Sequence, residues 1–127
     1  VLIVEDDFEV RKLVRTILES NQYEVVEAGS VSEAEARLDP PPDAALVDVD
    51  MPGETGVEFL LKLRRHPTLK ALPVSFMTAY PDRVARLMPA GLAMALLEKP
   101  FKQQQVLDTL KKILKPGVSS ASGVSSV

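Results

Sequence analysis

Acidic, hydroxyl and amine side chains follow four separate apolar runs of the sequence, at positions where a buried strand would be ending. They are Glu5, Asp6, Asp48, Asp50, Thr78 and Lys99. Clustered carboxylates in a partly dry crevice would repel one another, so this set makes sense chiefly with a divalent cation. Oxygen ligands without histidine or cysteine favour Mg²⁺ or Mn²⁺. A hard cation beside an ammonium and a hydroxyl can hold a phosphoryl group, and one carboxylate can then act as a nucleophile.

For these side chains to meet, the apolar runs that precede them must lie side by side. The runs are short and mostly apolar, which predicts buried strands. Their ranges are 1–4, 23–28, 44–47, 73–77 and 93–97. Helical spacing follows each run, and Asp7 is expected to cap the first helix. The pairs Ser30 with Glu33 and Thr55 with Glu58 have the capping-box pattern, which predicts two further helix starts.

The helical segments are expected to cover both faces of the sheet. Their predicted inward residues are Val10, Leu13, Val14, Ile17 and Leu18; Val31, Ala34 and Leu38; Val57, Leu60, Leu61 and Leu63; and Val106, Leu107, Leu110, Ile113 and Leu114. A fourth helix, at about 82–88, is confined between Pro81 and Pro89 and must be short. This alternation predicts an α/β fold with a doubly wound five-stranded parallel sheet. Such sheets bind ligands beyond the carboxyl ends of their strands, where the candidate residues stand.

Composition narrows the class of protein. The chain has 127 residues, which fits one domain at 1–115 followed by a Gly/Ser-rich tail or linker at 116–127. It contains no cysteine, so it has neither disulfides nor a thiolate metal site, and a reducing cytoplasm is the expected location. The net charge is −3 with scattered basic residues, so direct nucleic-acid binding is not expected. No apolar run is long enough to span a membrane, so we expect no membrane contact.

Four short motifs resemble the receiver domain of two-component response regulators, of the chemotaxis-regulator type. They are Leu-Ile-Val-Glu-Asp-Asp at 2–7, Asp-Val-Asp-Met-Pro-Gly at 48–53, Met-Thr-Ala at 77–79 and Glu-Lys-Pro-Phe at 98–101. They occur in the family's order, and together they are far more specific than any one alone. The resemblance covers about residues 1–115. It implies a flavodoxin-like (β/α)5 three-layer sandwich with strand order 2-1-3-4-5.

The resemblance also implies roles for the candidate residues. Asp48 would accept a phosphoryl group from the phosphohistidine of a sensor histidine kinase or a histidine phosphotransfer protein. Asp6 would be a direct Mg²⁺ ligand and Glu5 a water-bridged one. Thr78 would hydrogen-bond one phosphoryl oxygen, and Lys99 would pair with another. The domain would then be a signalling module that phosphorylates and dephosphorylates itself, not a turnover enzyme.

By the same resemblance, a turn and a cis peptide bond would complete this site. The backbone carbonyl of Asp50 would be a further metal contact, delivered by the turn at Met51-Pro52-Gly53, while the Asp50 side chain would face the approach of hydrolytic water. The Lys99–Pro100 bond would be cis, which would aim the amine inward. Tyr80 is expected to influence water access as well.

The sequence departs from the family pattern at the surface that usually contacts partners. Many receivers carry an aromatic residue three positions before the lysine, which swings inward on phosphorylation, but here that residue is Leu96. Together with the short fourth helix, this predicts a weaker shift of the usual partner face, or a homodimer formed through other elements. An output domain could follow the Ser-rich end.

Two rival functions are consistent with parts of the sequence. Asp48-Val49-Asp50 also fits the DxD motif of haloacid-dehalogenase-type phosphatases, but in that family the nucleophile follows the first strand and the acidic pair comes last. A pseudo-receiver would keep the fold only for protein contact. Individually, the candidates have simpler explanations: acidic residues after strands often cap helices, and Thr78 and Lys99 could be a turn threonine and a surface lysine.

Overall fold

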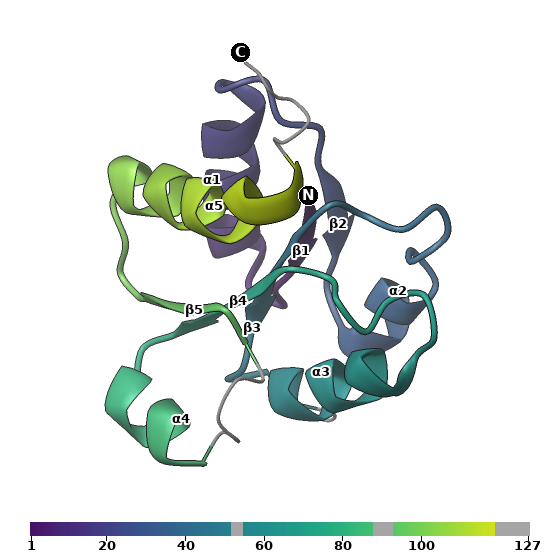
Figure 1. Cartoon of the computed structure of the whole chain (residues 1–127). Helices are drawn as coiled ribbons and strands as arrows, with labels where there is room; N and C mark the ends of the chain where they lie inside the picture. The colour runs from purple at the N-terminus through teal and green to yellow at the C-terminus, as the bar shows by residue number, and fades with distance from the viewer. Residues whose placement is uncertain (52–54, 88–92, 119–127) are drawn as a thin grey trace.

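The computed structural model describes residues 1–51, 55–87 and 93–118, and strands and helices alternate along these described residues (Figure 1). The strands are β1 Leu2–Val4, β2 Val26–Ala28, β3 Ala45–Asp48, β4 Val74–Thr78 and β5 Ala95–Glu98. The helices are α1 Phe8–Glu19, α2 Val31–Glu35, α3 Gly56–Arg65, α4 Pro81–Leu87 and α5 Gln103–Val118. No helix of these described residues is long and apolar enough to cross a membrane.

The five strands form one parallel sheet in the order β2-β1-β3-β4-β5, which confirms the predicted topology. β1, β3 and β4 are buried along their whole length because helices cover both of their faces. All five strands begin later than predicted. The shift is one residue for β1, β3 and β4, two residues for β5, predicted from Ala93, and three residues for β2, predicted from Tyr23.

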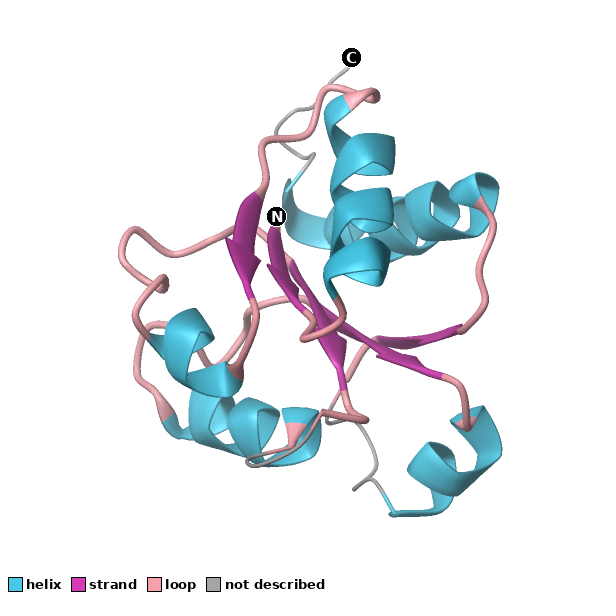
Figure 2. Cartoon of the chain, turned by 180° about the vertical axis from the view of Figure 1, so that it is seen from behind, coloured by secondary structure: helices cyan, strands magenta, loops and turns pink. Residues whose placement is uncertain are grey.

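Two helical layers enclose the sheet. Helices α1 and α5 lie on one face, while α2, α3 and α4 lie on the other, as the two opposite views in Figures 1 and 2 show. Side chains alternate between these layers along each strand, so Ile3 joins the core under α1 and α5 whereas Leu2 and Val4 join the other core. The structure is therefore the predicted three-layer sandwich.

Two of the predicted helix caps form in full. The Asp7 side chain accepts hydrogen bonds from the backbone N–H groups of Glu9 and Val10, which satisfies donors that α1 cannot satisfy internally. Thr55 and Glu58 exchange both hydrogen bonds of a capping box at the start of α3. These local contacts fix where both helices begin.

The start of α2 differs from the prediction. Ser30 accepts a hydrogen bond from the backbone of Glu33, but the Glu33 carboxylate binds the N–H of Gly29 at 2.6 Å instead of completing the capping box. α2 also ends at Glu35, so the predicted inward residue Leu38 lies outside the helix, although its side chain still packs against the core. The proline-rich segment after it cannot continue a helix.

Two predicted core leucines face solvent. Leu13 on α1 and Leu61 on α3 are 49% and 36% exposed. Each is adjacent in sequence to a fully buried residue, Val14 or Leu60, and successive residues of a helix are rotated by about 100°. The buried stripe of each helix is therefore narrower than the apolar pattern suggested.

The predicted short fourth helix is confirmed. α4 runs over only Pro81–Leu87, and Met88 and Pro89, which were predicted to end it, lie outside the described residues. α5 continues to Val118, beyond the predicted domain end at residue 115. The boundary between domain and tail stays a prediction, because residues 119–127 are not described.

Candidate functional site at the carboxyl ends of the strands

Four strand ends deliver the predicted side chains to one edge of the sheet. Asp48 and Thr78 are the last residues of β3 and β4, and Glu5 and Lys99 directly follow β1 and β5. Since all strands are parallel, these ends meet, and the backbone N–H of Lys99 donates to the Thr78 carbonyl at 2.8 Å. The chain also brings Asp6 to this edge through the loop between β1 and α1.

The carboxylate of Asp48 is almost completely buried, with 2% of the residue exposed. Its Oδ1 accepts a hydrogen bond from the backbone N–H of Asp50 at 2.8 Å and lies 3.4 Å from the Lys99 ammonium nitrogen. Burial of a carboxylate is costly unless it is paired, and here one ammonium and one amide supply the compensation. Asp48 is therefore held in place with a cation beside one of its oxygens.

Glu5 shares the same cation. It is 1% exposed, and its Oε1 lies 2.7 Å from the Lys99 nitrogen, while Oε2 accepts the backbone N–H of Asp7 at 3.1 Å. Burial raises the pKa of Glu5 to about 7, and the neighbouring Asp48 carboxyl adds to the rise, whereas Lys99 and the Asp7 amide oppose it. Glu5 is thus less readily ionised than an exposed glutamate.

Lys99 connects the two buried carboxylates. Burial alone would lower the pKa of this ammonium, but contacts with Glu5 and Asp48 outweigh that effect and raise the pKa. The peptide bond between Lys99 and Pro100 is cis, as the family resemblance implied. Lys99 therefore remains a cation at neutral pH.

Three carboxylates are arranged so that they could hold a metal ion. Glu5, Asp6 and Asp48 each offer an oxygen, and these oxygens lie within 4.8 Å of one another. Oε1 of Glu5 is buried and contacts Lys99 as an ion pair, but it receives no hydrogen bond from the described residues. An all-oxygen donor set with an incompletely satisfied buried oxygen fits Mg²⁺ or Mn²⁺. The predicted carbonyl contact of Asp50 remains a prediction, and Pro52 and Gly53 of its turn lie outside the described residues.

Thr78 makes a contact that the sequence did not predict. Its buried hydroxyl lies 3.1 Å from Oδ2 of Asp50 and 3.3 Å from Oδ1, and it also accepts the backbone N–H of Tyr80 at 2.9 Å. Oδ2 of Asp50 accepts a further hydrogen bond from the backbone N–H of Ala79 at 3.2 Å. The exposed Asp50 carboxylate thus accepts hydrogen bonds from two donors at the end of β4, the Thr78 hydroxyl and the Ala79 backbone N–H.

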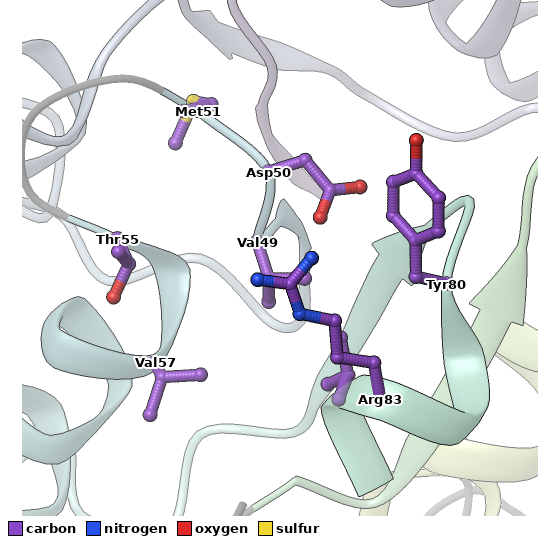
Figure 3. A pocket seen from close by; sticks show the side chains of 8 residues that line it. Val49, Asp50, Met51, Thr55, Val57, Tyr80 and Arg83 are labelled. Atoms are coloured by element: carbon purple, nitrogen blue, oxygen red, sulfur yellow. The ribbon is translucent and has the colours of Figure 1, made fainter. Parts of the chain in front are cut away.

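A pocket of about 520 Å³ opens beside Asp50 (Figure 3). Its lining residues are Val49, Asp50, Met51, Thr55, Val57, Tyr80, Arg83 and Val84. Arg83 extends from α4 into the pocket, toward the segment that carries Asp50. Sequence analysis did not single out this arginine, because nothing in its spacing distinguishes it from other surface arginines.

Close packing fixes the start of α3 against β3. A side-chain carbon at Gly56 would lie 2.7 Å from the backbone oxygen of Asp48 and 2.9 Å from Cγ1 of Val47, closer than real contacts of this kind. Only glycine therefore lets the helix approach the strand end that carries Asp48.

Leu96, the residue three positions before Lys99, lies within β5. It is partly buried, pairs in register with Phe76 and packs against the core on the side of α2, α3 and α4. Its side chain therefore faces the layer that contains the short helix α4.

Comparison with known proteins identifies the family to which these features belong. A sequence model of the response regulator receiver domain matches residues 1–111. The phosphate regulon transcriptional regulatory protein PhoB of Escherichia coli is 32% identical over 118 residues, which cover 91% of this chain and 51% of PhoB. A CpxR homolog of Haemophilus influenzae, also a transcriptional regulatory protein, is 32% identical over 127 residues, which cover 99% of this chain and 55% of that protein.

A solved structure has the same fold. The chemotaxis response regulator CheY4 of Vibrio cholerae is 30% identical with a TM-score of 0.81, and the match covers 89% of this chain and 96% of CheY4. By contrast, the chain spans about half the length of the curated relatives it matches.

Proposed function

This chain belongs to the receiver domains of two-component response regulators, and we propose that Asp48 is the residue through which it accepts a phosphoryl group. The observation that supports this most directly is the pairing at the sheet edge: a buried carboxylate lies 3.4 Å from an ammonium and within one acidic cluster with Glu5 and Asp6. Glu5 is equally buried and lies nearer to Lys99, at 2.7 Å. The choice of Asp48 therefore also rests on its motif, Asp-Val-Asp-Met-Pro-Gly, and on its place at the end of the central strand β3.

In the proposed reaction an oxygen of Asp48 attacks the phosphorus of a phosphohistidine. The O–P bond forms as the P–N bond breaks, and the imidazole leaves with the bonding electron pair and takes a proton from solvent. Lys99 neutralises charge on one phosphoryl oxygen, and the hydroxyl of Thr78 donates to another. A Mg²⁺ ion bound by Asp6, Asp48, the carbonyl of Asp50 and, through water, Glu5 would neutralise further phosphoryl charge. Hydrolysis of the acyl phosphate by water then restores the carboxylate.

The partners follow from this chemistry. The phosphoryl donor is a histidine kinase or a histidine phosphotransfer protein in the cytoplasm, and the receiver docks on it through the edge that carries Asp48. Because similar curated proteins are transcriptional regulators of about twice this length, the output is an additional domain or a homodimer that the receiver controls.

Mass spectrometry tests the acceptor directly. After incubation with acetyl phosphate and Mg²⁺, the intact mass of the chain should rise by one phosphoryl group, and Asp48→Asn should abolish that rise. Asp43→Asn, which alters an exposed carboxylate elsewhere on the chain, is the matched control and should be phosphorylated normally. An unmodified wild type, or equal modification of Asp48→Asn, would contradict the proposal. Continued release of phosphate from small phosphoesters would indicate a phosphatase instead.

The coupling between this site and the partner face is also part of the proposal. Leu96 lacks the bulk and polar edge of an aromatic ring, and α4 has only seven residues, so phosphorylation should shift the α4–β5–α5 face less than in receivers with the aromatic residue. Light scattering with and without beryllofluoride measures any dimer. A beryllofluoride-dependent dimer that substitutions on β5 and α5 abolish would contradict this expectation.

A further inference from the structure

The two hydrogen-bond donors at the end of β4 already bind an anion within the chain. The Thr78 hydroxyl and the Ala79 backbone N–H both donate to Oδ2 of Asp50, at 3.1 and 3.2 Å. A hydroxyl and an adjacent N–H that converge on one anionic oxygen are the donors expected around a phosphoryl oxygen. The Asp50 carboxylate therefore occupies a ready-made site for such an oxygen.

That occupied site is next to the proposed phosphoryl acceptor. Asp50 is two residues from Asp48, and its own backbone N–H donates to the Asp48 carboxylate at 2.8 Å. The proposed function requires the Thr78 hydroxyl to donate to the phosphoryl group on Asp48. The hydroxyl has a single proton, so it cannot donate fully to the Asp50 carboxylate and to the phosphoryl group at the same time. Two anions placed on the same donors would also repel each other.

A cation stands near the place to which the Asp50 carboxylate could move. Arg83 is exposed on α4, and its guanidinium extends into the pocket that Asp50 and Tyr80 also line (Figure 3). Within the part of the chain that the structure describes, Arg83 has no ion pair or hydrogen bond. It thus offers a partner for a carboxylate displaced from Thr78.

These contacts suggest an exchange, which rests on the proposed function. We propose that Asp50 is a positioning residue: in the unphosphorylated chain its carboxylate holds Thr78 and Ala79, and it transfers to Arg83 when the phosphoryl group on Asp48 takes those donors. Asp50 thereby slows phosphorylation, and the transfer links phosphorylation to α4 without an aromatic residue at position 96. No covalent step is added to the reaction.

Substitutions at Asp50 separate the hydrogen bonds from the charge. Asp50→Ala removes both, whereas Asp50→Asn removes the charge but keeps an oxygen that can accept from Thr78 and Ala79. The rate of mass gain with acetyl phosphate and the affinity for beryllofluoride, both measured with Mg²⁺, should rise on the order of tenfold in Asp50→Ala and less in Asp50→Asn. Asp50→Asn equal to or faster than Asp50→Ala would show that charge alone acts, and would overturn the proposal.

A double-mutant cycle tests the transfer to Arg83. Arg83→Gln should lower the affinity for beryllofluoride by about threefold in the wild-type background, since an exposed ion pair is weak, and should have no effect in the Asp50→Ala background. Arg86→Gln, at another exposed arginine of α4, is the matched control and should change neither. An equal effect of Arg83→Gln in both backgrounds would mean that Arg83 acts on the ligand directly, which would overturn the transfer.

A readout without phosphorylation separates this inference from the function on which it rests. The amide resonance of Ala79 and its hydrogen exchange should change in metal-free Asp50→Ala and much less in Asp50→Asn, because only the first loses the acceptor. An unchanged Ala79 amide in both variants would overturn the positioning role. If the Ala79 amide responds as expected but no variant gains mass on Asp48, the contact stands, whereas the proposed function, and the exchange that depends on it, fail.

Discussion

The loops after β1 and β3 begin in the same way and then differ. In each, a buried carboxylate at the strand end accepts the backbone N–H two residues later: Glu5 from Asp7 at 3.1 Å, and Asp48 from Asp50 at 2.8 Å. In the first loop the carboxylate of the residue that donates this N–H, Asp7, caps its own helix, α1. In the loop after β3 the corresponding carboxylate, that of Asp50, instead reaches the end of β4 and accepts a hydrogen bond from Thr78.

This difference contrasts a contact that serves the fold with one that, under the proposed function, would affect the chemistry. The hydrogen bonds of Asp7 to α1 persist whatever binds at the site, because no ligand needs those N–H groups. The hydrogen bonds of Asp50 use donors that a phosphoryl group would need. Two acidic residues at equivalent places in their loops therefore have separate roles, and substitutions can test each role.

The largest expected effect comes from the cation that both loops share. Lys99→Met leaves the buried carboxylates of Glu5 and Asp48 without their counter-ion, so the free energy of unfolding at pH 8 should fall by about 3 kcal/mol. The loss should be smaller at pH 5.5, because protonation of Glu5 removes part of the unpaired charge. Urea denaturation of the metal-free chain measures both values.

The control for this substitution is Lys102→Met, at an exposed lysine of the same loop, which should change the free energy of unfolding by less than about 0.5 kcal/mol. A Lys99→Met chain as stable as the control at pH 8 would show that the ion pair does not link the two loops.

The second effect isolates the buried carboxylate of the first loop. The folded-state pKa of Glu5 is about 7, above its unfolded value of 4.5, so the folded chain binds the proton more tightly. Stability of the metal-free chain should therefore decrease as the pH rises from about 4.5 through about 7, by on the order of 2 kcal/mol. Glu5→Gln should lack this decrease and should be the more stable chain at pH 8.

Urea denaturation in a chelator between pH 5 and pH 8 provides the comparison, with Glu9→Gln as a control at an exposed glutamate of α1. If Glu5→Gln and wild type have parallel pH profiles, burial does not determine the ionisation of Glu5.

The third effect concerns metal binding between the loops. Mg²⁺ at ten times its dissociation constant should stabilise the chain by about 1.4 kcal/mol, because the ion binds only the folded state. Asp6→Asn should remove most of this gain, whereas Glu9→Gln should retain it. Thermal unfolding with and without Mg²⁺ measures the gain, and a full response in Asp6→Asn would exclude Asp6 as a ligand.

The smallest effect concerns the carboxylate that caps α1. Asp7→Ala should lower the free energy of unfolding by about 1 kcal/mol, the usual contribution of an N-cap, and should leave the stabilisation by Mg²⁺ unchanged. Denaturation with and without the ion gives both numbers. A weakened Mg²⁺ response would mean that Asp7 belongs to the metal site and that the two loops are more alike than their hydrogen bonds suggest.

The contrast between the loops also explains what the sequence could predict. The cap by Asp7 spans two and three residues, so local spacing was enough to predict it. The meeting of Glu5, Asp48 and Lys99 was predictable because parallel strands bring their carboxyl ends to one edge. The Thr78–Asp50 contact joins residues 28 apart and depends on side-chain orientation, which local spacing does not determine.

The same limit applies to the helices. The helical pattern placed α1 and α3, but it counted Leu13 and Leu61 as buried because an apolar residue at the margin of a stripe resembles one at its centre. Tertiary packing decides whether a residue at the margin of the stripe is buried or exposed. The role of Arg83 likewise depends on where α4 lies relative to β3, and no local pattern carries that information.

The tight approach at Gly56 limits the routes by which a signal can leave the acceptor. With no side chain between the start of α3 and the backbone of Asp48, the helix and the strand end form one mechanically stiff unit. A rearrangement after phosphorylation therefore has little freedom to proceed by sliding α3 along β3. It would instead spread sideways across the sheet edge toward β4, where exchangeable side-chain hydrogen bonds allow motion at low cost.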